Sequence, residues 1–155
     1  MKKLSVALTA LIASLSIAAA GCNVSMSKSY TFHVDTGDDV EVSLAMSDGL
    51  DLKQEDGEYT VTKDGKNVLS GVFITPEMRS SYIDAVKAES KAQIISDTDD
   101  CFSWKVDGQS GKEYNRIVLI KGSGTYALIG SLINDEGAEE ISDKAYGALS
   151  LEKAD

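Results

Sequence analysis

Few residues of this sequence can do chemistry: two cysteines, one histidine and a set of carboxylates. A cysteine thiol is a nucleophile and a site of acylation, and an imidazole can act as its base. The cysteines are Cys22 and Cys101, and the histidine is His33. Only Cys22 has surroundings that point to one particular reaction.

Cys22 ends a segment with the layout of a secretory signal. The chain opens with Lys2 and Lys3, residues 4–20 carry no charge, and Gly21 directly precedes the cysteine. A basic start, an apolar stretch and small residues at the exit are typical of an export signal. The stretch is shorter than the ~20 residues that a spanning helix needs. We therefore expect residues 1–21 to be a cleaved signal peptide.

The junction Ala19-Ala20-Gly21-Cys22 resembles the lipobox of bacterial lipoproteins, although Ala19 stands where that family prefers leucine. In the family, the cysteine thiol receives a diacylglyceryl group and a peptidase cuts just before it. The resemblance implies cleavage between Gly21 and Cys22, and acylation (palmitate-type chains) of Cys22. The lipid bilayer is then a partner, and the chain faces the extracytoplasmic side of the cell membrane or outer membrane. An ordinary signal peptide or an uncleaved anchor that contains a cysteine is the alternative.

Composition limits the partners of the remaining chain. Without residues 1–21, 134 residues are left, enough for one domain. They hold 13 Lys plus Arg against 25 Asp plus Glu, a net charge of −12. An acidic domain repels nucleic acid, so no nucleic-acid partner is expected. An envelope protein, a peptide or a wall component is the kind of partner we expect.

Cys101 and His33 are expected to play no catalytic role. If Cys22 is acylated, Cys101 has no disulfide partner, and the carboxylates before it disfavour a thiolate. A buried structural cysteine is the expectation. His33 lies on the polar side of a strand pattern and should be exposed. One histidine and one free cysteine are too few for a structural zinc site, so no metal or cofactor is predicted.

Acidic and glycine-rich turns offer two further candidate sites. Residues 35–39 and 97–100 could bind calcium through carboxylate oxygens, but neither has the closing glutamate of an EF-hand. Turns also favour aspartate for backbone reasons, and both readings stay open. Gly122-Ser123-Gly124 lacks the Lys-Ser/Thr of a phosphate loop, and a hairpin turn explains it.

Alternating apolar residues predict most of the strands. Residues 23–29 are expected to be a short tether. Strands at 30–34 and 40–46 form one predicted hairpin, and strands at 59–61 and 68–74 form a second across Asp64-Gly65. The later strands are predicted at 92–96, 102–106, 113–120, 125–133 and 149–152.

Two helices interrupt these strands. Thr75, Pro76 and Glu77 predict a helix start, and that helix should end near Ser90. Its inward face is expected to hold Met78, Tyr82, Ala85 and Val86. Asp135 is expected to cap a second helix, whose inward face holds Ala138, Ile141, Ala145 and Leu149.

This order predicts one α+β domain over residues 30–155: a twisted antiparallel β-sheet of about six to eight strands with two helices packed on it. The strands at 113–120 and 125–133 should lie mid-sheet. The layout resembles the PsbP-like fold. The resemblance rests on Tyr30-Thr31-Phe32 in the first strand, the helix after Phe73 and the paired strands around Gly122-Ser123-Gly124. That fold also serves adaptors and envelope proteins without enzymatic activity, so it implies no chemistry.

Phe102, Trp104 and Tyr114 are the aromatic residues expected to gather on neighbouring strands. They form either a core cluster or, if exposed in a groove, a ligand surface. The expected function is non-enzymatic binding in the cell envelope. The alternative is an envelope hydrolase that uses carboxylates alone. A deep cleft with two facing carboxylates favours the hydrolase, and a shallow site favours the binding domain.

Replacing Cys22 by serine tests the lipid anchor. Because the acyl chains on the thiol provide the membrane attachment, Cys22→Ser should move the protein from the membrane fraction to the medium or periplasm. Fractionation and immunoblotting measure this. A Cys22→Ser protein that stays in the membrane fraction would contradict the anchor.

Overall fold

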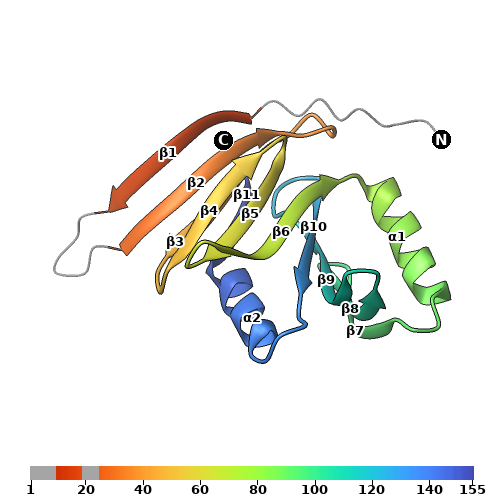
Figure 1. The fold of residues 1–155 in the computed structure, drawn as a ribbon. Helices are drawn as coiled ribbons and strands as arrows, with labels where there is room; N and C mark the ends of the chain where they lie inside the picture. The colour runs from red at the N-terminus through yellow and green to blue at the C-terminus, as the bar shows by residue number, and fades with distance from the viewer. Residues whose placement is uncertain (1–9, 19–24) are drawn as a thin grey trace.

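The computed structural model describes residues 10–18 and 25–155. Within them the chain forms eleven strands and two helices, α1 (Pro76–Ala88) and α2 (Ala138–Ala148) (Figure 1). The strands are β1 (Ala10–Ala18), β2 (Ser25–His33), β3 (Asp39–Met46), β4 (Leu50–Glu55), β5 (Glu58–Lys63), β6 (Lys66–Ile74), β7 (Gln93–Asp97), β8 (Cys101–Gly108), β9 (Gly111–Leu119), β10 (Tyr126–Leu132) and β11 (Leu149–Lys153).

The strands form two antiparallel sheets. The small sheet has the order β1-β2-β3-β11, and the large sheet has the order β4-β5-β6-β10-β9-β8-β7. The predicted α+β class, with a large antiparallel sheet and two helices, is confirmed, and β9 and β10 lie mid-sheet as expected. Cleavage before Cys22 would remove β1 and leave sheets of three and seven strands. Gly21 and Cys22, the predicted cleavage and lipidation positions, lie outside the described residues.

Asp-Gly turns build the first half of the domain. Both predicted hairpins form, β2 with β3 and β5 with β6. At the β5–β6 turn, Asp64 and Gly65 have φ of 50° and 81°, the left-handed values of a tight hairpin turn. Asp56 and Gly57 repeat this geometry, with φ of 49° and 82°, and join β5 to β4. The prediction omitted β4, although Asp56-Gly57 was a signal for it.

The main core lies between the two sheets. Apolar side chains of the small sheet pack against the face of the large sheet that is turned toward it. Helix α2 closes one end of the space between the sheets with Ala145. The aromatic rings of Phe32 and Phe73 meet across the sheets with centroids 5.1 Å apart. The buried members include Phe32, Val40, Val42, Leu44, Leu52, Val61, Leu69, Ala127 and Ile129.

A second core lies on the opposite face of the large sheet, beneath α1. Its buried residues are Ile74, Ile83, Phe102, Trp104 and Ile117. Thr75 caps α1 as predicted, because its side chain accepts a hydrogen bond from the backbone N–H of Met78 at 3.3 Å.

The inward face of α1 differs from the prediction. Ile83 is buried and Val86 is half-buried against the second core, but Met78 and Tyr82 are 36% and 39% exposed and Ala85 is exposed. The apolar arc of the helix is wider than its contact with the sheet. The contact therefore uses one side of that arc and leaves Met78, Tyr82 and Ala85 on the helix flank.

Two further boundaries also differ. Residues 25–29, expected to be tether, are part of β2, because they pair with β3. Asp135 does not cap α2; Gly137 does, with a left-handed φ of 79° and no side-chain hydrogen bond. The carbonyl of Asp135 instead accepts from the backbone N–H of Ala138 at 3.1 Å.

A pair of alanine variants tests which side of α1 carries the packing. Ile83→Ala should lower the free energy of unfolding by about 2–4 kcal/mol, because it leaves a cavity in the second core. Tyr82→Ala should change it by less than about 1 kcal/mol, because the side chain lies on the surface. Urea unfolding followed by the fluorescence of Trp104 measures both. Equal losses in the two variants would contradict this orientation of the helix.

Candidate functional site: a split in the large sheet

The aromatic residues predicted as a ligand surface do not form one. Phe102 and Trp104 contact each other with centroids 5.5 Å apart, but both are buried in the core beneath α1. Tyr114 points to the other face of the sheet, where it stacks on Arg116. Successive residues of a strand alternate between faces, and this separates Tyr114 from the other two rings. The prediction of a core cluster is confirmed for Phe102 and Trp104, and the prediction of a ligand surface at these residues is wrong.

His33 and Cys101 lie on different sheets, on β2 and β8. The ring of His33 is exposed, as predicted, and its Nδ1 lies 2.8 Å from Oδ1 of Asp39. Cys101 is a free thiol, half-buried on β8. Burial raises its pKa, and the nearby Arg116 offsets part of this effect. A thiol with a raised pKa is a poor nucleophile at neutral pH.

The acidic turns do not converge on a metal site. In the part of the chain that the structure describes, no three His, Cys, Asp or Glu side chains are placed to hold an ion together. Asp38 pairs with Lys153 at 2.9 Å, and Asp97 pairs with Lys87 at 2.8 Å. Ion pairing with Lys153 also keeps the pKa of Asp38 below its usual value.

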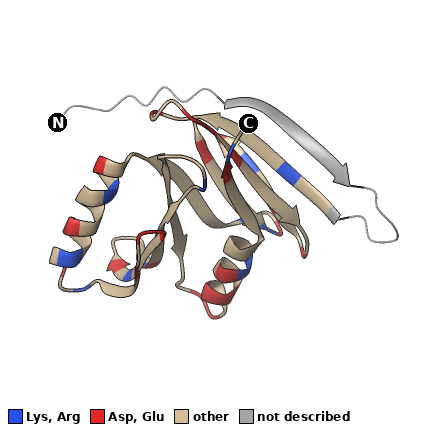
Figure 2. Ribbon diagram, turned by 180° about the vertical axis from the view of Figure 1, so that it is seen from behind, with Lys and Arg blue, Asp and Glu red and all other residues tan. Residues whose placement is uncertain are grey.

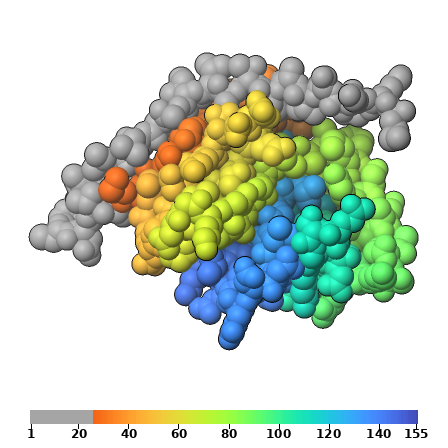
Figure 3. Space-filling model, in the orientation of Figure 1, coloured from red at the N-terminus to blue at the C-terminus, as the bar shows by residue number. Residues whose placement is uncertain are grey.

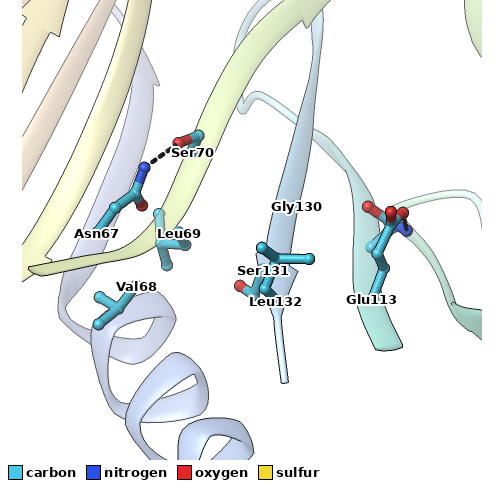
Figure 4. A pocket seen from close by; sticks show the side chains of 9 residues that line it. Asn67, Val68, Leu69, Ser70, Glu113, Gly130, Ser131 and Leu132 are labelled. Carbon is cyan, nitrogen blue, oxygen red and sulfur yellow. Dashed lines mark hydrogen bonds between the residues drawn. The ribbon is translucent and has the colours of Figure 1, made fainter. Parts of the chain in front are cut away.

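The candidate site is a split in the large sheet between β6 and β10. The two strands pair from Ile74–Tyr126 down to Ser70–Gly130 and then separate, although both continue. Below that point β6 stays paired with β5, and β10 stays paired with β9. Figure 4 shows the two strands diverging beyond Ser70 and Gly130.

A β-bulge accounts for the split. Leu69 pairs with Val61 and Asn67 pairs with Thr62, so Val68 is an extra residue on β6 without a partner on β5. A bulge bends its strand and increases the local twist. The bend carries the start of β6 away from β10.

The split forms a pocket of about 300 Å³, the lower end of the range for small-ligand sites. Its lining residues are Asn67, Val68, Leu69, Ser70, Glu113, Asn115, Gly130, Ser131 and Leu132. Leu132 is 54% exposed and forms a rim. At Gly130, an added Cβ would meet only Oδ1 of Asn115, at 3.0 Å, so the absence of a side chain there keeps the pocket open.

Uncharged hydrogen-bonding groups dominate the polar part of the pocket. Nδ2 of Asn67 donates to Oγ of Ser70 at 3.1 Å, and Nδ2 of Asn115 donates weakly to Oε2 of Glu113 at 3.5 Å. Glu113 is the one carboxylate in the lining. The side-chain amides of Asn67 and Asn115 and the Ser70 hydroxyl retain lone pairs and protons with which they can bind a ligand.

Helix α2 forms the back of this region. It contacts both β6 and β10, and the Ser142 hydroxyl donates to that of Ser131 at 2.7 Å. Arg116, only 3% exposed, pairs with Asp143 and lies between the rings of Tyr114 and Tyr146, with its Cζ 3.8 Å and 4.6 Å from their centroids. A buried guanidinium held by stacking and a carboxylate thus fixes α2 behind the split.

Sequence reasoning missed this site, although two signals were present. Gly130-Ser131 lies within a strand that is otherwise apolar, and Asn115 lies mid-strand on β9. Small and polar residues within a central strand indicate a gap in the packing above it. The split itself depends on the pairing of β6, which lies far from β10 in the sequence.

No protein-family description, curated protein sequence or solved structure matches this chain. The lipobox and PsbP-like resemblances therefore remain predictions. In the described ranges, 10–18 and 25–155, no helix is long and apolar enough to cross a membrane.

The ion pair between the buried Arg116 and the exposed Asp143 gives a test in which the two members are expected to differ in their effect on stability. Asp143→Asn should lower the free energy of unfolding by about 1–3 kcal/mol, because it leaves a buried guanidinium without a counter-charge. Arg116→Met removes the charge itself and should cost less. Urea unfolding followed by Trp104 fluorescence compares them.

Glu140→Gln is the matched control, because it breaks the exposed pair between Glu140 and Lys144 on the same helix. It should change stability by less than about 0.5 kcal/mol. A larger loss for Arg116→Met than for Asp143→Asn would contradict the role assigned to this pair.

Proposed function

We propose that this chain is a lipid-anchored extracytoplasmic lipoprotein whose domain binds an envelope protein, a peptide or a wall component in the split of the large sheet. The observation that carries the proposal is an open pocket lined by two side-chain amides, two serine hydroxyls and one carboxylate. Convergent hydrogen-bonding groups on an apolar floor are typical of ligand sites. The binding function is non-enzymatic.

The position of the anchor supports this proposal. β2 begins at Ser25, three residues after Cys22, so the lipid would hold the domain by the small sheet. The split belongs to the large sheet, on the other side of the main core. Figure 3 shows the start of β2 (orange) and α1 (green) at opposite ends of the molecule. Attachment at β2 would leave the split accessible.

The carboxylates favour binding over hydrolysis. A carboxylate hydrolase places two acids on either side of the scissile bond. Each of five pockets on the described surface, the split among them, is lined by only one Asp or Glu. None of these five pockets holds a pair of facing carboxylates, and this supports the binding function over the hydrolase alternative.

Site-specific photo-crosslinking tests the proposal in the native membrane. A photo-reactive residue replaces Leu132 at the pocket rim of the full lipoprotein, and in a second variant it replaces Glu58, the first residue of β5. Position 132 should give a reproducible crosslinked product that position 58 does not give. Mass spectrometry of the product identifies the partner.

Gly130→Val supplies the matched control for that crosslink. Valine suits a strand and fills the pocket floor, and the one neighbour within reach is the end of the Asn115 side chain. The product at position 132 should be lost in this variant. The same product at the same yield with valine at position 130 would overturn the proposal.

A further inference from the structure

We propose that the mature chain forms a symmetric dimer in which β2 pairs with β2 of a second copy, antiparallel and centred on Ser29. The dimer goes beyond the proposed binding function, but it rests on the proposed cleavage before Cys22, because this cleavage removes β1. Three features of β2 carry the inference: an edge that accepts a strand, the lack of protection at that edge, and a sequence that is complementary to itself.

The outer edge of β2 has the space and the geometry to bind an extended strand. In the full chain, β1 pairs with this edge in antiparallel register, from Ala18–Ser25 to Ala10–Phe32. Figure 1 shows β1 at the margin of the molecule, with no other strand or helix beyond it. Cleavage before Cys22 removes β1 and, with it, the hydrogen bonds between the two strands. An exposed strand edge of this kind is a template for pairing with another chain.

In the described chain after cleavage, the other three sheet edges are each protected against such pairing. β4 carries three charged residues among its six. β7 is five residues long and contains a bulge. β11 is covered by Lys121, whose carbonyl accepts from the backbone N–H of Lys153 at 3.2 Å. Charges, short bulged strands and covering loops are the usual devices that prevent edge-to-edge association.

β2 lacks all of these devices. It is nine residues long and pairs with β3 without a bulge, from Met26–Met46 to His33–Asp39. It has no proline, and its one lysine, Lys28, is already paired with Asp51 at 2.9 Å. A long and regular edge strand with so little charge associates readily. The open edge of β2 is therefore the one at which the mature chain is expected to bind another strand.

The sequence of β2 is complementary to itself when two copies pair about Ser29. The residues that become directly opposite are Met26 and Phe32, Ser27 and Thr31, and Lys28 and Tyr30. Apolar, hydroxyl and cation–aromatic pairs of this kind stabilise a sheet, and no lysine faces another lysine. Met26 is 43% exposed and gains an apolar neighbour. This self-complementarity points to a second copy of the chain as the partner strand.

An antiparallel β2 pair also suits two lipid anchors. It would join the three-stranded sheets of two copies into one sheet with the order β11-β3-β2-β2-β3-β11. β2 begins three residues after Cys22, and its nine residues span about 30 Å, so the two anchors lie at opposite ends of the β2 pair. Both anchors can reach one bilayer when the pair runs along the membrane surface. Two anchors in one assembly hold it more firmly than one.

Cysteine cross-linking in the native membrane tests the dimer and its register. Directly opposite residues of an antiparallel pair are close enough for a disulfide, whereas position 27 of the two copies would be displaced by about 13 Å. Mild oxidation should therefore link Ser29→Cys across the two copies, and Ser27→Cys at least about tenfold less. The double variant Ser27→Cys/Thr31→Cys should link again, because each cysteine then faces the other type. Non-reducing gel electrophoresis measures the dimer band of each variant.

Two controls report on random collisions. The wild-type chain has the half-buried thiol of Cys101, and Ser150→Cys places an exposed thiol on the covered edge of β11. Neither should give a dimer band. No band from Ser29→Cys, or equal bands from Ser27→Cys and Ser150→Cys, would overturn the β2 dimer. The mass of the monomer in the same samples shows whether residues 1–21 are removed. An uncleaved chain would overturn the proposed processing and the dimer together, whereas a cleaved, membrane-bound chain without the band would overturn the dimer alone.

Discussion

Covering both faces of the seven-stranded sheet is the constraint on which the rest of the structure depends. Its central strands carry apolar residues on both sides, and water must be excluded from both. The small sheet and α2 cover one face, and α1 covers only part of the other. The uncovered part must be polar, and it is there that Ser70 and Asn115 lie. The pocket thus lies where the bulge in β6 opens the sheet on the part of this face that α1 leaves uncovered.

The polar cluster around Arg116 links this constraint to the pocket. The bulge at Val68 separates β6 from β10, and the separation also reaches the face of the large sheet that α2 covers. On that face, Ser142 of α2 accepts a hydrogen bond from Arg116 of β9 and donates one to Ser131 of β10, in place of apolar contacts. These hydrogen bonds satisfy polar groups that would otherwise be buried without partners. The same interactions support the back of the pocket, so stability and the site depend on one cluster.

The acidic residues of the surface and Glu113 differ in their surroundings. The acidic residues are spread over both helices and the turns of the molecule (Figure 2), and some of them are paired with lysine. Such exposed pairs contribute little to stability and keep the surface solvated. Glu113 differs because it lines a pocket, and its carboxylate lies over Gly108 of β8. An acidic surface also attracts cationic ligands toward such a site.

The sequence by itself determined the features that depend on neighbouring residues. Asp64-Gly65 specifies its hairpin through left-handed backbone angles, Thr75 caps α1, and apolar alternation predicts most of the strands. The motif at Cys22 predicts attachment in the same local way. Tertiary structure alone decided which flank of α1 is buried, on which face Tyr114 lies, and where β6 leaves β10. Those outcomes depend on contacts between segments distant in the chain, and local propensities leave such contacts open.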